Sequence, residues 1–166
     1  MKRYCTIISL SLFFGLFVYI IFRSQHTIVN IMLNTLTNEE ASPIIIVIRK
    51  HCPLPDFAIY SLPEGLWALA ATLVSKHLFI RLLNKQIHLA WMPLCYSVSL
   101  ELLQLFHIMR GRFDVMDILW SFFFTLIGIY IIKCPLPIQY LFRKFNYRTF
   151  FFVYIYAIVF LSHVSM

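Results

Sequence analysis

Charged side chains are scarce in this 166-residue chain, where they make up 13% of the residues. Hydrophobic residues reach 61% and the mean hydropathy is +0.81, far above the apolar share of a soluble domain. The composition therefore argues against an ordinary soluble globule and predicts a membrane protein. Acids are the rarest charges, seven against 14 lysines and arginines. The resulting charge of +7 suits loops beside anionic lipid head groups better than it suits binding to nucleic acid.

Cysteine is also rare, and its four positions do not form a disulfide framework. Two are expected near the cytoplasmic face and one inside a helix, which leaves Cys52 alone on the outside. His51, Cys52 and Asp56 lie in a proline-rich loop and are too weak a pattern to predict a metal site. The chain lacks a zinc motif, a G-x-S-x-G nucleophile elbow and a glycine-rich phosphate loop. We therefore predict no cofactor and favour a non-enzymatic role over an enzyme.

Long apolar stretches are abundant instead. A span needs about 20 apolar residues, and the stretches here predict an all-α, polytopic transmembrane bundle of about five helices in a single membrane domain, 1–166. The first stretch has a basic start like a signal peptide, but no small-residue cleavage pattern follows it, so we expect a retained anchor. The predicted spans are 4–22, 57–75, 87–107, 115–132 and 149–164.

Basic residues are divided unequally between alternate loops. Nine of the 14 precede the first span or lie between spans two and three or four and five, whereas five lie in the other loops. Because cytoplasmic loops carry the excess of lysine and arginine, this partition places the N-terminus in the cytoplasm and the C-terminus outside. All seven acids fall outside or within the membrane. We therefore expect a multi-pass protein with the lipid bilayer as its partner and a polar site toward the outer face.

The external loop, 23–56, is the only long connection, and loops of this length are usually functional or contain structure of their own. Its apolar run 44–48 is too short to span and is a strand, a re-entrant piece or an interfacial segment. Pro53 and Pro55 then interrupt regular structure before the second span.

The run from Glu101 to Asp117 places acids, an amide and two arginines inside apolar sequence, where ionised side chains are costly and mark function. Ser97, Glu101 and Gln104 share one helical face, at i, i+4 and i+7. Glu101 lies about 9 Å below the outer end of its helix, and Glu64 about 10 Å below the same side. Two carboxyls at one level would share a proton or pair with a cation.

The turn after this helix supplies cations. Arg110 and Arg112 flank a glycine, and an arginine guanidinium can bridge a carboxylate and an amide. Asp114 and Asp117 open the next helix at i, i+3, where acids favour the positive end of the helix dipole. Asp114 is equally well explained as an N-cap. Asp117 continues into a stripe of small or polar residues that favours close helix packing: Ser121, Thr125 and Gly128.

These residues resemble the VanZ-like family of small bacterial membrane proteins, whose signature is E-x-x-Q, then an arginine, then an acid-rich turn leading into a helix with small residues. The resemblance covers roughly 55–132, which we take as the VanZ-like core. The segment around Glu64 is similar to one in some short members, whereas Trp120-Ser121-Phe122 departs from the asparagine and glycine common there. The matching positions are Glu101, Gln104, Arg110 or Arg112, Asp114 and Asp117.

The resemblance implies a cell-envelope role in the bacterial cytoplasmic (inner) membrane. The founding member is associated with teicoplanin resistance, which makes a glycopeptide one candidate ligand, although no biochemical activity is firmly assigned to the family. Resistance by this chain does not follow from the resemblance alone.

Four hypotheses follow from these patterns. The first is an external-facing polar pocket that binds a lipid head group, a cell-wall precursor or a glycopeptide, with the arginines holding its anionic part. The second is a small proton- or cation-coupled transporter, for which a homo-oligomer would complete a pathway. The third is an intramembrane enzyme with a divalent metal, and the fourth is a polar lock of the helical hairpin. The candidate ligand-binding residues are Glu64, Glu101, Gln104, Arg110, Arg112, Asp114 and Asp117.

Overall fold

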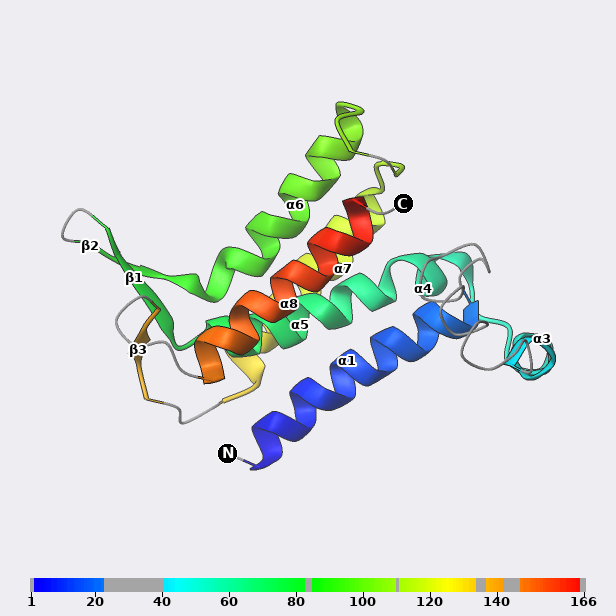
Figure 1. The fold of residues 1–166 in the computed structure, drawn as a ribbon, viewed down its shortest axis with the longest axis horizontal. Helices are drawn as coiled ribbons and strands as arrows, with labels where there is room; N and C mark the ends of the chain where they lie inside the picture. The colour runs from blue at the N-terminus through cyan, green and yellow to red at the C-terminus, as the bar shows by residue number, and fades with distance from the viewer. Residues whose placement is uncertain are drawn as a thin grey trace.

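The computed structural model describes residues 2–22, 41–82, 85–109, 111–133, 137–141 and 147–164. Over these ranges the chain is mainly helical, as predicted, and a small sheet lies at one end of the helices (Figure 1). The helices are α1 (Lys2–Phe22), α3 (Ala41–His51), α4 (Asp56–Tyr60), α5 (Leu62–Ser75), α6 (Met92–Leu105), α7 (Val115–Leu126) and α8 (Tyr147–Val164). A 3-10 turn, η1 (Leu89–Trp91), precedes α6, and a π-helical turn, η2 (Ile127–Ile131), follows α7.

The sheet corrects the all-α prediction. Strands β1 (Leu78–Leu82), β2 (Lys85–His88) and β3 (Gln139–Tyr140) form it in the order β2-β1-β3, with β1 antiparallel to β2 and parallel to β3. The predicted third span, 87–107, therefore starts late: its first residues belong to β2 and η1, and α6 begins at Met92. Pro93 lies in the first turn of α6, where a missing N–H is tolerated.

Helix α5 is the centre of the bundle and packs against α1, α6, α7 and α8. Ser61 separates it from α4, and Pro63 occupies its first turn, so the predicted second span consists of two helical pieces. Small side chains let the neighbours approach closely. At Gly65 an added Cβ would lie 2.6 Å from a ring carbon of Phe124 on α7, too close for any larger residue without movement.

Helix α8 is attached to this centre by aromatic packing. The indole N–H of Trp67 on α5 donates to the carbonyl oxygen of Ile155 over 3.0 Å. The rings of Trp67, Tyr96 and Tyr156 pack with centroids 5.3 to 5.5 Å apart, a favourable separation for tilted aromatic pairs. The surrounding core cluster comprises Trp67, Ala68, Ala71, Leu78, Leu89, Leu141, Phe152, Ile155 and Tyr156.

Within the described part of the chain, two helical stretches are long and apolar enough to cross a membrane: Cys5–Phe22 and Asp56–Ser75. Leu89–Leu105 and Val115–Ile131 are shorter apolar helices. This supports a membrane protein only weakly, because the core helix of a soluble protein and a signal sequence share the same length and composition.

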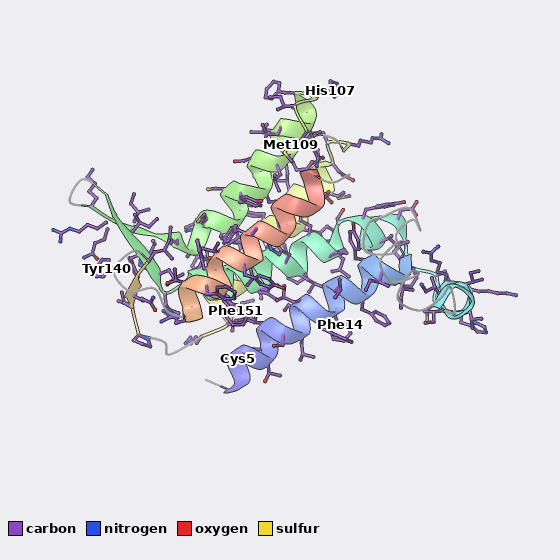
Figure 2. All side chains as sticks on the ribbon, viewed as in Figure 1. Cys5, Phe14, His107, Met109, Tyr140 and Phe151 are labelled. Carbon is purple, nitrogen blue, oxygen red and sulfur yellow. The ribbon has the colours of Figure 1, made fainter. Side chains whose placement is uncertain are left out.

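The molecule has two distinct ends. Tyr140 marks the sheet end, where α5 finishes and α6 begins, whereas His107 and Met109 mark the connection between α6 and α7 at the opposite end (Figure 2). Of the predicted external loop, residues 23–40 lie outside the described ranges, and 41–51 form α3. The apolar run 44–48 is thus helical, and the strand alternative for it is wrong.

Candidate functional site

Three helices each contribute one acid to a single point in the bundle. Glu64 comes from the first turn of α5, Glu101 from the last part of α6, and Asp117 from the first turn of α7. One carboxylate oxygen of each lies within 4.8 Å of the other two. We call these three residues the carboxylate cluster. Glu64 and Glu101, which were expected at the same depth in the bundle, therefore lie next to each other.

The α6 side of the site follows the predicted helical face. Ser97 and Glu101 are 0% and 1% exposed and Gln104 is buried, whereas Leu102 and Leu105 on the other side are exposed. The spacing i, i+4, i+7 therefore identified the inward face of α6 although its residues are polar. A buried face made of polar groups is the reverse of the pattern in a soluble helix.

Buried hydroxyls support the carboxylate cluster. Ser97 Oγ donates to Glu64 Oε1 and lies 3.0 Å from Ser121 Oγ on α7. Because a hydroxyl has one hydrogen, Ser97 accepts from Ser121 when it donates to Glu64. Ser97 and Ser121 are both completely buried, so this contact fixes the distance between α5, α6 and α7 at the level of the acids.

Asp114 serves as the N-cap of α7, which resolves the alternative left open by the sequence. Its Oδ1 accepts from the backbone N–H of Met116 over 2.9 Å. Its own backbone N–H donates to Glu101 Oε2, also over 2.9 Å. Glu101 therefore joins the carboxylate cluster to the start of the next helix, whereas the side chain of Asp114 caps α7 and is not one of the three clustered acids.

The α6–α7 connection bends sharply over the buried amide. His107 has a positive φ of 57°. Gly111 has a φ of 130°, which only glycine adopts easily. A Cβ on Gly111 would lie 2.8 Å from Cδ of Gln104, so the carboxamide of Gln104 lies directly under this turn. Gln104 thus acts as a support for the turn.

The structure describes only one of the two arginines that were expected to hold the anionic part of a ligand. Arg110 lies outside the described residues. Arg112 is exposed, and among the residues described here no ion pair joins it to the carboxylate cluster. The expectation that Arg112 holds the anionic part of a ligand stays a prediction.

Further polar groups continue from the carboxylate cluster along the inside of the bundle. Thr72 and Thr125 are fully buried, with their hydroxyl oxygens 3.5 Å apart between α5 and α7. At the sheet end, Lys76 Nζ donates to backbone carbonyls of η2 and the residue after it, including Gly128 over 3.2 Å and Ile132 over 3.1 Å. Ser121 and Thr125 were recognised in the sequence only as a stripe that allows close packing. Their hydrogen-bond partners on α5 and α6 were not predictable from spacing on α7 alone.

Comparison with family models, curated proteins and solved structures finds no match to this chain. Its function is therefore argued from the geometry of the site.

Proposed function

We propose that this chain is an integral membrane protein whose helices bury polar groups between them and expose large apolar side chains on their outer surface. The buried side chains of α5, α6 and α7 include Thr72, Ser97, Glu101, Ser121 and Thr125. Large apolar side chains are exposed instead on several helices. Lipid makes such an outer surface favourable, whereas water would make it an aggregation hazard. The exposed apolar residues include Phe13, Phe14 and Phe17 on α1, Leu102 and Leu105 on α6, Leu119, Phe122 and Phe123 on α7, and Phe150, Phe151 and Tyr154 on α8.

We further propose that α1, α4–α5, α6, α7 and α8 are the five spans, with the sheet end in the cytoplasm. Exposed basic residues of the described chain at this end include Arg81, Lys85 and Lys133, whereas the carboxylate cluster lies toward the other end. This separation agrees with the preference of lysine and arginine for cytoplasmic loops.

Reporter fusions test the topology. A fusion after Lys85 or Lys144 is expected to be active only as a cytoplasmic reporter, and one after Gly111 only as an external reporter, because the fusion points lie on opposite sides of a span. An external Lys85 fusion or a cytoplasmic Gly111 fusion would overturn the map. Fusions after Glu40 and Met166, both expected outside, provide the matched controls.

The function that the site supports best is the binding of a cationic group at the outer end of the bundle. The observation that carries this proposal is the separation of the carboxylate oxygens of Glu64, Glu101 and Asp117, which is within 4.8 Å. Calcium–oxygen distances of 2.3–2.6 Å place opposite ligands about 4.6–5.2 Å apart, so the three oxygens can surround one ion. Carboxylates this close repel one another unless a proton or another positive charge lies between them. Together with the resemblance of 55–132, this suggests a VanZ-like envelope protein with a cation site.

A small cation suits the site better than a large ligand held directly by all three acids, because Glu101 is only 1% exposed. The ammonium group of a lipid head group, cell-wall precursor or glycopeptide also carries a positive charge and can donate hydrogen bonds to the same carboxylate oxygens. It would reach the half-buried Glu64 and Asp117 first. The shared chemistry is therefore a positive group of small radius.

Titration of the purified full chain with Ca²⁺, Mg²⁺ or Mn²⁺ is expected to raise its unfolding temperature, because a ligand at 100 times its Kd stabilises the folded state by about 2.7 kcal/mol. The stabilisation should weaken as the pH falls, since protons compete for the carboxylates. Potassium at equal ionic strength is the control for screening. A parallel experiment compares the unfolding temperature in nanodiscs with and without phosphatidylethanolamine. A rise with this lipid alone would identify its ammonium group, rather than a metal ion, as the ligand. Equal unfolding temperatures in all arms would contradict the cation site.

A structural lock is the second candidate, favoured by the hydrogen bond from the backbone N–H of Asp114 to Glu101. In this case the carboxylate cluster holds a proton and fixes α7 against α6, without any ligand. The lock predicts a loss of folding stability when Glu101 is replaced by a residue without an acceptor oxygen, and no dependence of stability on added cations.

A further inference from the structure

Helix α3 stands apart from the direction of the bundle. Figure 1 shows α3 almost end-on, whereas α1 is seen along its length, so α3 runs across the direction of α1. Arg49 Nε donates to the carbonyl oxygen of Ile21, which has no partner within the helix at the end of α1. Ile45 is buried. The hydrogen bond from Arg49 places α3 at the C-terminal end of α1.

The composition of α3 is apolar followed by basic. Ile46 and Val47 are 57% and 55% exposed, and the last turn carries Arg49, Lys50 and His51. With 11 residues the helix is about 16 Å long, roughly half of the 30 Å hydrocarbon core, so it cannot span. Exposed isoleucine and valine next to basic side chains match the boundary between acyl chains and lipid phosphates.

Aromatic side chains follow at the same end of the molecule. Phe57 and Tyr60 of α4 are 49% and 51% exposed, a few residues after α3. Tyrosine, as at Tyr60, is enriched where hydrocarbon meets the head groups. We therefore expect one depth in the bilayer for three segments: the end of α1, all of α3 and the start of α4.

We propose that α3 is an interfacial helix that lies in the outer head-group layer of the bilayer. Ile46 and Val47 enter the acyl boundary, while the ammonium group of Lys50 extends along its flexible stem to a lipid phosphate. Arg49 is engaged by α1 and links the two helices. This inference rests on the proposed membrane insertion of the bundle, which its test checks separately.

The test uses the full chain with its four native cysteines replaced by serine and one new cysteine carrying an environment-sensitive fluorophore. The labelled positions are Val47, Phe123 and Lys85, in nanodiscs of phosphatidylcholine and phosphatidylglycerol. Phe123 lies on the exposed apolar face of α7 and reports on lipid, whereas Lys85 lies on the exposed strand β2 and reports on water. We expect the label at Val47 to emit at shorter wavelength than at Lys85 and to be quenched several-fold more by lipid carrying a shallow spin label than by iodide.

Retained stability of the cysteine-free chain is checked first by thermal unfolding, and Val47→Trp in the native chain provides a second probe if that chain does not fold.

The outcomes separate the two proposals. Lipid quenching at Phe123 combined with iodide quenching at Val47 would overturn the interfacial helix and leave the membrane bundle intact. Iodide quenching at both positions would overturn membrane insertion itself. Replacing Lys50 by Gln should reduce the dependence of the Val47 signal on the phosphatidylglycerol content, and an unchanged dependence would remove the phosphate contact from the proposal.

Discussion

Changing Glu64 to Gln or Asp117 to Asn is expected to lower the affinity for divalent cations by about 100-fold while the protein still folds. Removal of groups that merely orient a metal ligand already costs about 10- to 100-fold in affinity, and these residues supply the proposed ligand oxygens themselves. The amides keep the size and much of the hydrogen-bonding capacity of the acids, so the hydroxyl of Ser97 retains an acceptor at residue 64. The measurement is a calorimetric titration of each variant beside the unchanged chain.

Asp114→Asn is the matched control, since Asp114 is a neighbouring acid outside the carboxylate cluster and an asparagine oxygen can still accept from Met116. It should bind cations as the unchanged chain does. An equal loss of affinity in Asp114→Asn would show that net charge, rather than the carboxylate cluster, controls binding. Variants at Glu64 and Asp117 that bind normally would eliminate the cation site.

Two variants of Glu101 separate cation binding from the structural lock. Gln at this position keeps an oxygen for the backbone N–H of Asp114 but removes the charge, so a lock would survive and a cation site would not. Leu removes the acceptor as well, and the unpaired backbone N–H should cost about 1–3 kcal/mol. Normal cation binding by the Gln variant together with a destabilised Leu variant would assign Glu101 to the lock alone.

Changing Trp67 to Ala should destabilise the protein by about 3–5 kcal/mol, the usual cost of removing a large buried aromatic side chain. Trp67 is 7% exposed, and its loss removes ring contacts with Tyr96 and Tyr156 as well as the hydrogen bond to Ile155. We expect α8 to separate from α5 first, because this residue connects the two helices. Thermal unfolding in detergent, with limited proteolysis after α7, measures both effects.

Trp91→Ala is the control for this prediction, because Trp91 is 39% exposed and packs less. Its stability should change by much less than that of Trp67→Ala. Trp67→Phe keeps an aromatic ring and loses the N–H donor, which should cost about 0.5–1.5 kcal/mol for one hydrogen bond, since the carbonyl of Ile155 keeps its bond within α8. Equal stability of Trp67→Ala and the unchanged chain would contradict the role of this cluster in holding α8.

The sequence by itself indicated the long apolar helices and the inward face of α6. Runs of apolar residues long enough for a span have one dominant solution in lipid, since a helix satisfies every backbone group internally. Polar residues at helical spacing, as at Ser97, Glu101 and Gln104, marked the buried face of α6 because they share one side of an otherwise apolar helix. The rise per residue also placed Glu64 and Glu101 at one level before any fold was known.

Only the tertiary structure decided which polar groups meet. Asp114 and Asp117 are three residues apart, and spacing did not distinguish the N-cap from the acid that joins Glu64 and Glu101. The orientation of α7 relative to α5 and α6 directs Asp117 toward Glu64 and Glu101. Arg112 lies in the turn before α7 and is exposed. The sheet likewise depends on a contact between β1 and residues 139–140, about 60 positions later in the chain. Local periodicity carries no information about such a partner, because the edge of β1 that faces away from β2 is paired only by the distant strand β3.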